Sequence, residues 1–125
     1  MPVIRFIGLP SLSGEQEAEL IELCHRAVRG VPNLELTENL EKHVSVLISN
    51  DRLPGRQRPV IFVEVFGLLR KPRRQNNDRQ LLCDQLIQFF ETFASLHLSH
   101  IGETLVECNV EPFIESSHRA EVFGS

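Results

Sequence analysis

The chain contains no tryptophan and no tyrosine, and it has only three cysteines. These cysteines, at positions 24, 83 and 108, form no C-x-x-C pair and no metal-ligand spacing, so neither a zinc site nor a disulfide framework is predicted. No apolar run approaches the ~20 residues that a membrane-spanning helix needs. The first ten residues also lack the basic and then apolar pattern of a signal peptide. We therefore expect a cytoplasmic protein with reduced thiols, no bound cofactor and no association with a membrane.

Charge is unevenly distributed along the 125 residues, although the net charge is only −4. Residues 51–80 contain eight basic and three acidic side chains, whereas the rest of the chain contains five basic and fourteen acidic ones. A local excess of positive charge favours an anionic ligand. Nucleic acid is not expected as a partner, because the basic stretch lacks the interleaved aromatic side chains on which bases stack.

Hydrophobic periodicity predicts the same order of elements in both halves of the chain. The first half reads as a strand (3–9), a helix that begins at a Ser13/Gln16 capping box and stops near Gly30, a polar segment (33–42) and a strand (43–48). A loop (50–59) leads to the second half. That half reads as a strand (60–69), a basic loop (70–76), a helix capped by Asn77 with Gln80 that runs to about Ala94, and a strand (104–110).

The two halves also share a short sequence, because Pro-Val-Ile at 2–4 recurs at 59–61. Parallel strands joined by a helix form a βαβ unit. We therefore predict one α+β domain over residues 1–125, built from repeat units of about 1–50 and 59–111 with a C-terminal tail at 112–125. Its duplicated βαβ units form a four-stranded mixed sheet with two helices on one face. Both faces of the first strand carry apolar side chains, so the face without helices predicts an oligomer.

A chain that runs from Met-Pro directly into a strand and then through two βαβ units resembles the tautomerase superfamily. It is most similar to its double-length members, of the macrophage migration inhibitory factor and 5-carboxymethyl-2-hydroxymuconate isomerase type. Residues 75–86, QNNDRQLLCDQL, resemble the start of the second helix of the former. Residues 111–123 resemble the tail of the latter. The resemblance implies a homotrimer that acts as a tautomerase or isomerase on a small enol or keto carboxylate.

Pro2 is the catalytic residue that this resemblance implies. Removal of Met1 would turn its nitrogen from an amide into a secondary amine. A free α-amino group has a pKa of about 7.7–8.0, and burial or nearby cations lower that value. Such a base is suited to abstracting a proton next to a carbonyl.

Substrate-binding residues are predicted around this base. The developing oxyanion and the substrate carboxylate both need cations, for which Arg70 is the nearest positional match and Arg73 and Arg74 are alternatives. Phe6 is expected to line the pocket, and Asn109 is the nearest polar group on the last strand.

The sequence departs from the family at two positions. A second family arginine is replaced by Ser45, and the tyrosine of the inhibitory factor's last strand is absent. The general acid is therefore unidentified. Two alternatives stay open: a catalytically silent trimeric relative, and an anion-binding module that uses the basic loop 70–74. A tautomerase predicts that Pro2 dominates activity, whereas a binding module predicts that Arg73 and Arg74 dominate ligand binding.

Overall fold

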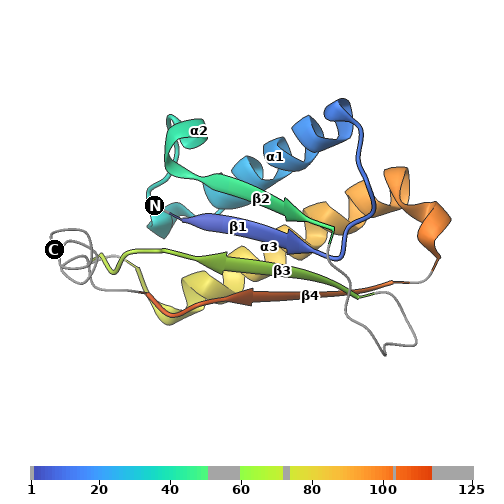
Figure 1. Cartoon of the computed structure of the whole chain (residues 1–125). Coiled ribbons are helices and arrows are strands. Elements are labelled where there is room, and N and C mark those ends of the chain that lie inside the picture. The colour runs from blue at the N-terminus through green and yellow to red at the C-terminus, as the bar shows by residue number, and fades with distance from the viewer. Residues whose placement is uncertain (1, 51–59, 72–73, 103, 114–125) are drawn as a thin grey trace, which may run out of the picture.

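A four-stranded sheet with the strand order β2-β1-β3-β4 forms the centre of the chain, and two long helices cover one of its faces (Figure 1). The computed structural model describes residues 2–50, 60–71, 74–102 and 104–113. Its elements are β1 (Val3–Ile7), α1 (Gly14–Arg29), η1 (Pro32–Leu34), α2 (Leu40–His43), β2 (Ser45–Ser49), β3 (Val60–Phe66), α3 (Asn76–His97), η2 (Ser99–Ile101) and β4 (Leu105–Val110). Strand β1 pairs in parallel with β2, β3 pairs in parallel with β4, and β1 and β3 are antiparallel. The predicted α+β fold is confirmed.

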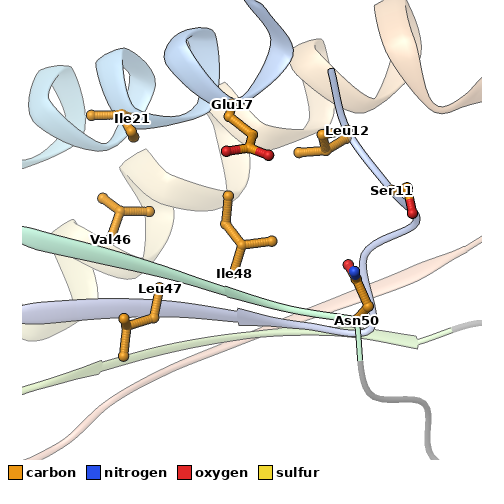
Figure 2. Close-up of a pocket in the computed structure, with 8 residues that line it drawn as sticks. All are labelled: Ser11, Leu12, Glu17, Ile21, Val46, Leu47, Ile48 and Asn50. Atoms are coloured by element: carbon orange, nitrogen blue, oxygen red, sulfur yellow. The ribbon is translucent and has the colours of Figure 1, made fainter. Parts of the chain in front are cut away.

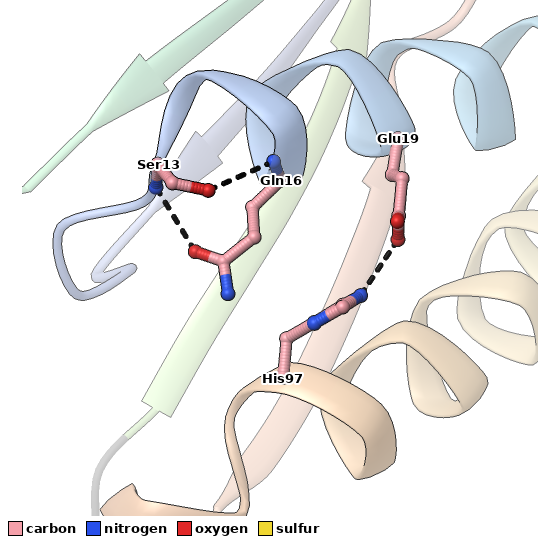
Figure 3. A network of polar contacts seen from close by, with 4 residues as sticks. All are labelled: Ser13, Gln16, Glu19 and His97. Atoms are coloured by element: carbon pink, nitrogen blue, oxygen red, sulfur yellow. Dashed lines mark hydrogen bonds and ion pairs between the residues drawn. The ribbon is translucent and has the colours of Figure 1, made fainter.

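The two long helices begin at capping boxes, of which one was predicted correctly. The Ser13 hydroxyl accepts a hydrogen bond from the Gln16 backbone N–H at 3.1 Å, and the Gln16 side chain accepts one from the Ser13 N–H at 2.9 Å (Figure 3). The prediction for α3 was wrong, because its cap is Gln75 rather than Asn77. The Asp78 carboxylate accepts from the Gln75 N–H at 2.7 Å, and a buried carboxylate is a stronger acceptor than the amide of Gln80.

Glycine ends the first strand of each half in the same way. Gly8 follows β1 with φ 93°, and Gly67 follows β3 with φ 83°. This left-handed region strongly favours glycine. A leucine that is only 2% exposed comes next in both halves, Leu9 in one and Leu68 in the other. Strand β3 consequently stops at Phe66, whereas the sequence predicted that it continues to residue 69.

Other boundaries also differ from the prediction. Strand β2 begins at Ser45, because His43 belongs to the short helix α2. Helix α3 continues past Ala94 to His97. The last turn of α3 is held to α1, where His97 Nε2 lies 2.6 Å from Glu19 Oε2 (Figure 3). Within α3, the His97 ring packs 4.9 Å from that of Phe93. The contact between His97 and Glu19 therefore joins the last turn of α3 to α1.

The core lies between the sheet and the helices. Ile4 and Phe6 of β1 have no exposed surface, and the Phe6 ring lies 5.3 Å from that of Phe90 in α3. On the opposite face of the described sheet the side chains are partly exposed, and Leu47 and Leu105 are 49% and 50% exposed. Within the described residues, every helix is too short or too polar to cross a bilayer.

Candidate active site

The predicted base and the start of the predicted basic loop lie at the same end of the sheet. Strands β1 and β2 begin at this end, and β3 and β4 finish there, as the pairing of Val3 with both Ser45 and Phe66 shows. Pro2 is buried at the start of β1, and its carbonyl accepts a hydrogen bond from the Ser45 N–H at 3.1 Å. The basic segment from position 70 follows β3 on leaving the same end (Figure 1). Pro2 therefore precedes the first residue of β1, and Arg70 follows the last residue of β3. Because these two neighbouring strands are antiparallel, both residues lie at the same end of the sheet.

Arg74 lies in this region but is occupied by the fold. Its side chain is buried, and its guanidinium donates to the carbonyls of Leu69 at 2.5 Å and Leu34 at 2.7 Å. Burial lowers the pKa of Arg74, while the nearby carboxylates of Glu35 and Asp78 act in the opposite direction. Arg74 thus ties the η1 turn to the loop before α3, and a substrate carboxylate would have to displace main-chain acceptors to reach it.

The other predicted residues are distributed over three environments. Arg70 is exposed at the end of the sheet that carries Pro2. Asn109 is exposed on β4, opposite Glu64 on the face of the sheet without helices. Phe6 is enclosed against Phe90, so its side chain contributes to the core and presents no surface to a ligand in the single chain. Arg73 lies outside the described residues. Arg70 and Asn109 are therefore the predicted binding residues that remain accessible.

An ion pair on the open sheet face was not predicted. Arg5 of β1 contacts the Glu64 carboxylate on β3, and its guanidinium carbon lies 5.6 Å from the centre of the Phe66 ring. Across the sheet, Arg5 and Glu64 share one row with Leu47 and Asn109. The signal in the sequence was a single charge of opposite sign in the first strand of each half. It could be paired only once the register between β1 and β3 was known.

Two hollows lie along the outer edges of the sheet, away from the predicted site residues that the structure describes. One of about 510 Å³ lies between α1 and β2, where the Glu17 carboxylate points toward the apolar side chains of Leu12 and Ile48 (Figure 2). The other, of about 600 Å³, lies between the end of α3 and β4. None of the predicted site residues that the structure describes lines either hollow. Among the described residues, no three histidine, cysteine, aspartate or glutamate side chains gather as a metal site.

No family model matches this sequence, and no curated protein matches it. Solved structures do match. The fused 4-OT wild-type asymmetric trimer, R7, is 20% identical, with a TM-score of 0.55 and coverage of 98% of this chain and 99% of that one. MIF2 of Leishmania major is 14% identical, with a TM-score of 0.58 and coverage of 89% of each chain. Pt0534 inactivated by 2-oxo-3-pentynoate is 15% identical, with a TM-score of 0.54 and coverage of 88% and 85%.

These matches extend over nearly the whole chain and include both βαβ units. At identities of 14% to 20%, these matches show the architecture alone. On this likeness and on its duplicated topology, the chain has the fold of the tautomerase superfamily.

Proposed function

We propose that this protein is a tautomerase or isomerase that uses Pro2 as a general base on a small enol or keto carboxylate. The observation that carries the proposal is the position of Pro2, buried at the first residue before β1, in a fold shared with fused 4-OT over 98% of the chain. The proposal requires removal of Met1, because only then is the Pro2 nitrogen an amine with a free lone pair.

In the proposed reaction, the Pro2 nitrogen takes a proton from the enol hydroxyl or from the carbon next to a carbonyl, and returns it at another position of the substrate. The pyrrolidine ring holds the Pro2 nitrogen in a fixed geometry relative to its Cα, so the lone pair is directed with little loss of entropy. Arg70 is exposed at the same end of the sheet and would hold the substrate carboxylate. Asn109 would supply a neutral hydrogen-bonding group, either in the same chain or across a subunit boundary.

Ketonisation of 2-hydroxymuconate and of enol phenylpyruvate tests the proposal. We expect untagged wild-type protein to accelerate at least one of the two reactions, and we expect Pro2→Ala to lose that acceleration. Pro10→Ala is the matched control, because Pro10 follows β1 at the opposite end of the strand and should leave the rate unchanged. Intact mass spectrometry reports in the same samples whether Met1 has been removed. A processed wild-type protein without activity toward either compound would contradict the proposal for these substrates.

A covalent probe provides a second test that needs no turnover. Pt0534 is inactivated by 2-oxo-3-pentynoate. The alkyne of 2-oxo-3-pentynoate is conjugated to a ketone, so a nucleophilic amine can add to the triple bond. We expect this compound to increase the mass of the N-terminal peptide of our protein and to leave that of Pro2→Ala unchanged. Equal labelling of both proteins would show that another nucleophile reacts.

We further propose that three copies assemble through the sheet face without helices, as R7 is an asymmetric trimer. Half-exposed leucines on that face support this arrangement. Leu47→Lys should convert the assembly to smaller species in sedimentation experiments. Leu81→Lys is the matched control, because Leu81 is similarly exposed, at 45%, but lies on α3. A wild-type monomer at micromolar concentration would contradict this proposal.

An anion-binding module without catalysis is the second candidate, favoured by the exposed positions of Arg70 and Lys71 at the Pro2 end of the sheet. It predicts that both carboxylates bind without being converted. Binding would then be weakened by Arg70→Met and unaffected by Pro2→Ala, which calorimetry can measure.

A further inference from the structure

Two cysteines that lie 25 positions apart meet where helix α3 crosses the edge strand β4. Cys83 belongs to the second turn of α3, and Cys108 to the helix-covered side of β4, opposite Val63. Helix α3 packs against β4, both cysteine side chains pack against the buried core, and the two thiols form a hydrogen bond with each other. Both thiols are intermediate in exposure, whereas the third cysteine, Cys24, is completely buried in α1. The fold therefore creates a thiol pair that no sequence motif announces.

Cys83 also contacts the main chain of the edge strand β4. The Glu111 N–H donates to the Val65 carbonyl of β3 at 2.9 Å, and successive N–H groups of a strand point to opposite sides. The Val110 N–H consequently points outward, away from β3. The Cys83 sulfur accepts a hydrogen bond from this N–H. Cys83 thus partners a main-chain donor that an edge strand would otherwise leave to solvent.

The two thiols have different chemical characters. The hydrogen bond from Cys108 lowers the pKa of Cys83 against the effect of partial burial, with smaller contributions in the same direction from the Val110 N–H and the Arg79 guanidinium. The same hydrogen bond, with burial, raises the pKa of Cys108. Burial alone raises that of Cys24. Since the thiolate is the nucleophile, Cys83 is the attacking sulfur of the pair and Cys108 holds the proton.

We propose that Cys83 and Cys108 are a redox-modification site, at which hydrogen peroxide converts the hydrogen-bonded thiol pair into a disulfide between α3 and β4. The Cys83 thiolate attacks one peroxide oxygen, the O–O bond breaks, and hydroxide (water, after it takes up a proton) leaves. The resulting Cys83 sulfenic acid is attacked by the Cys108 sulfur, which forms the S–S bond and releases a second water. The thiol pair loses two protons and two electrons, and hydrogen peroxide takes up both to become two waters.

The site is separate from the proposed base, so it does not depend on catalysis by Pro2. It does adjoin the last strand of the sheet, because Cys108 directly precedes Asn109 and points to the opposite face. In a reducing compartment such a disulfide would form only under oxidative conditions and would be reversed by thiols. The pair therefore fits a reversible modification better than a permanent structural link.

Thiol counting after brief exposure to hydrogen peroxide tests the proposal. The reduced protein has three free thiols, and we expect one to remain after oxidation, with all three recovered by dithiothreitol. Non-reducing peptide mapping should find the segments around Cys83 and Cys108 joined within one chain. Persistence of all three thiols, or oxidation confined to Cys24, would overturn the proposal, as would linkage only between chains.

Single substitutions assign the two roles. Cys108→Ala should leave the Cys83 sulfenic acid without its partner, so that dimedone adds to Cys83. Cys83→Ala should protect Cys108 from oxidation. Cys24→Ala is the control and should still lose both of its remaining thiols. Dimedone labelling of Cys108 in Cys83→Ala, at the rate seen for Cys83 in Cys108→Ala, would refute the assignment of the attacking sulfur. Mapping of the wild-type protein remains decisive if any variant fails to fold.

Discussion

Replacing Arg74 by methionine separates a structural role from a substrate-binding one. The guanidinium is buried and donates to the carbonyls of Leu34 and Leu69. Methionine has similar length and keeps the packing of the stem, but it cannot donate. The variant would therefore leave two main-chain acceptors without their partner, in a region where Glu35 and Asp78 also lose a compensating positive charge.

The expected loss of stability follows from these contacts. Each hydrogen bond from a charged donor contributes roughly 1.5–3 kcal/mol. Part of this is offset because the variant no longer buries a charge, a cost that the lowered pKa of Arg74 reflects. We expect a net loss of about 3 kcal/mol in the free energy of unfolding. With a urea m-value of about 1.5 kcal/mol/M, the unfolding midpoint should fall by about 2 M.

Urea unfolding followed by circular dichroism is the suitable assay, because the chain has no tryptophan or tyrosine for fluorescence. Arg70→Met is the matched control and should change the stability by less than about 0.5 kcal/mol, since Arg70 is exposed. The structural role of Arg74 would be refuted if Arg74→Met kept the wild-type midpoint. It would also be refuted if that variant raised the KM for a carboxylate substrate without loss of stability.

Three further outcomes are expected. Ser13→Ala should lower the free energy of unfolding by about 1 kcal/mol in urea titrations, because the capping box of α1 loses its hydroxyl acceptor. Phe90→Ala should cost about 3–5 kcal/mol, measured in the same way, because the ring is fully buried, whereas Phe89→Ala should cost less. The rate at which iodoacetamide alkylates Cys83 should rise with pH around a pKa below that of an ordinary thiol. Cys108→Ala should raise this pKa, because the hydrogen bond that favours the thiolate is lost.

Periodicity and capping were sufficient to predict the architecture. The alternation in β1 and the Ser13/Gln16 box depend on residues within a few positions of one another, and both were read correctly. The start of α3 was misplaced because its cap depends on Asp78, which is also bound by the Asn33 side chain at 3.2 Å from a distant turn. Local patterns therefore gave the elements, and tertiary contacts decided some of their ends.

The functional residues divide in the same way. The position of Pro2 at the start of a strand follows from the sequence alone. The separation of Arg70 from Arg74 does not, because both belong to one basic run and only the fold decides which guanidinium meets buried carbonyls. The pairing of Cys83 with Cys108 likewise requires the crossing of α3 over the edge of the sheet. Long-range register is what the sequence pattern could not supply.

The matching halves also have a consequence for the number of sites. Each half begins with Pro-Val-Ile, and each first strand ends at a left-handed glycine. A polypeptide has a single N-terminus, however, so the nitrogen of Pro59 is held in a peptide bond and has no lone pair to accept a proton. Duplication within one chain therefore leaves half of the equivalent positions without the chemistry proposed for Pro2. Residues of the second half have other roles. The Glu64 carboxylate contacts Arg5, and the Cys108 thiol pairs with Cys83.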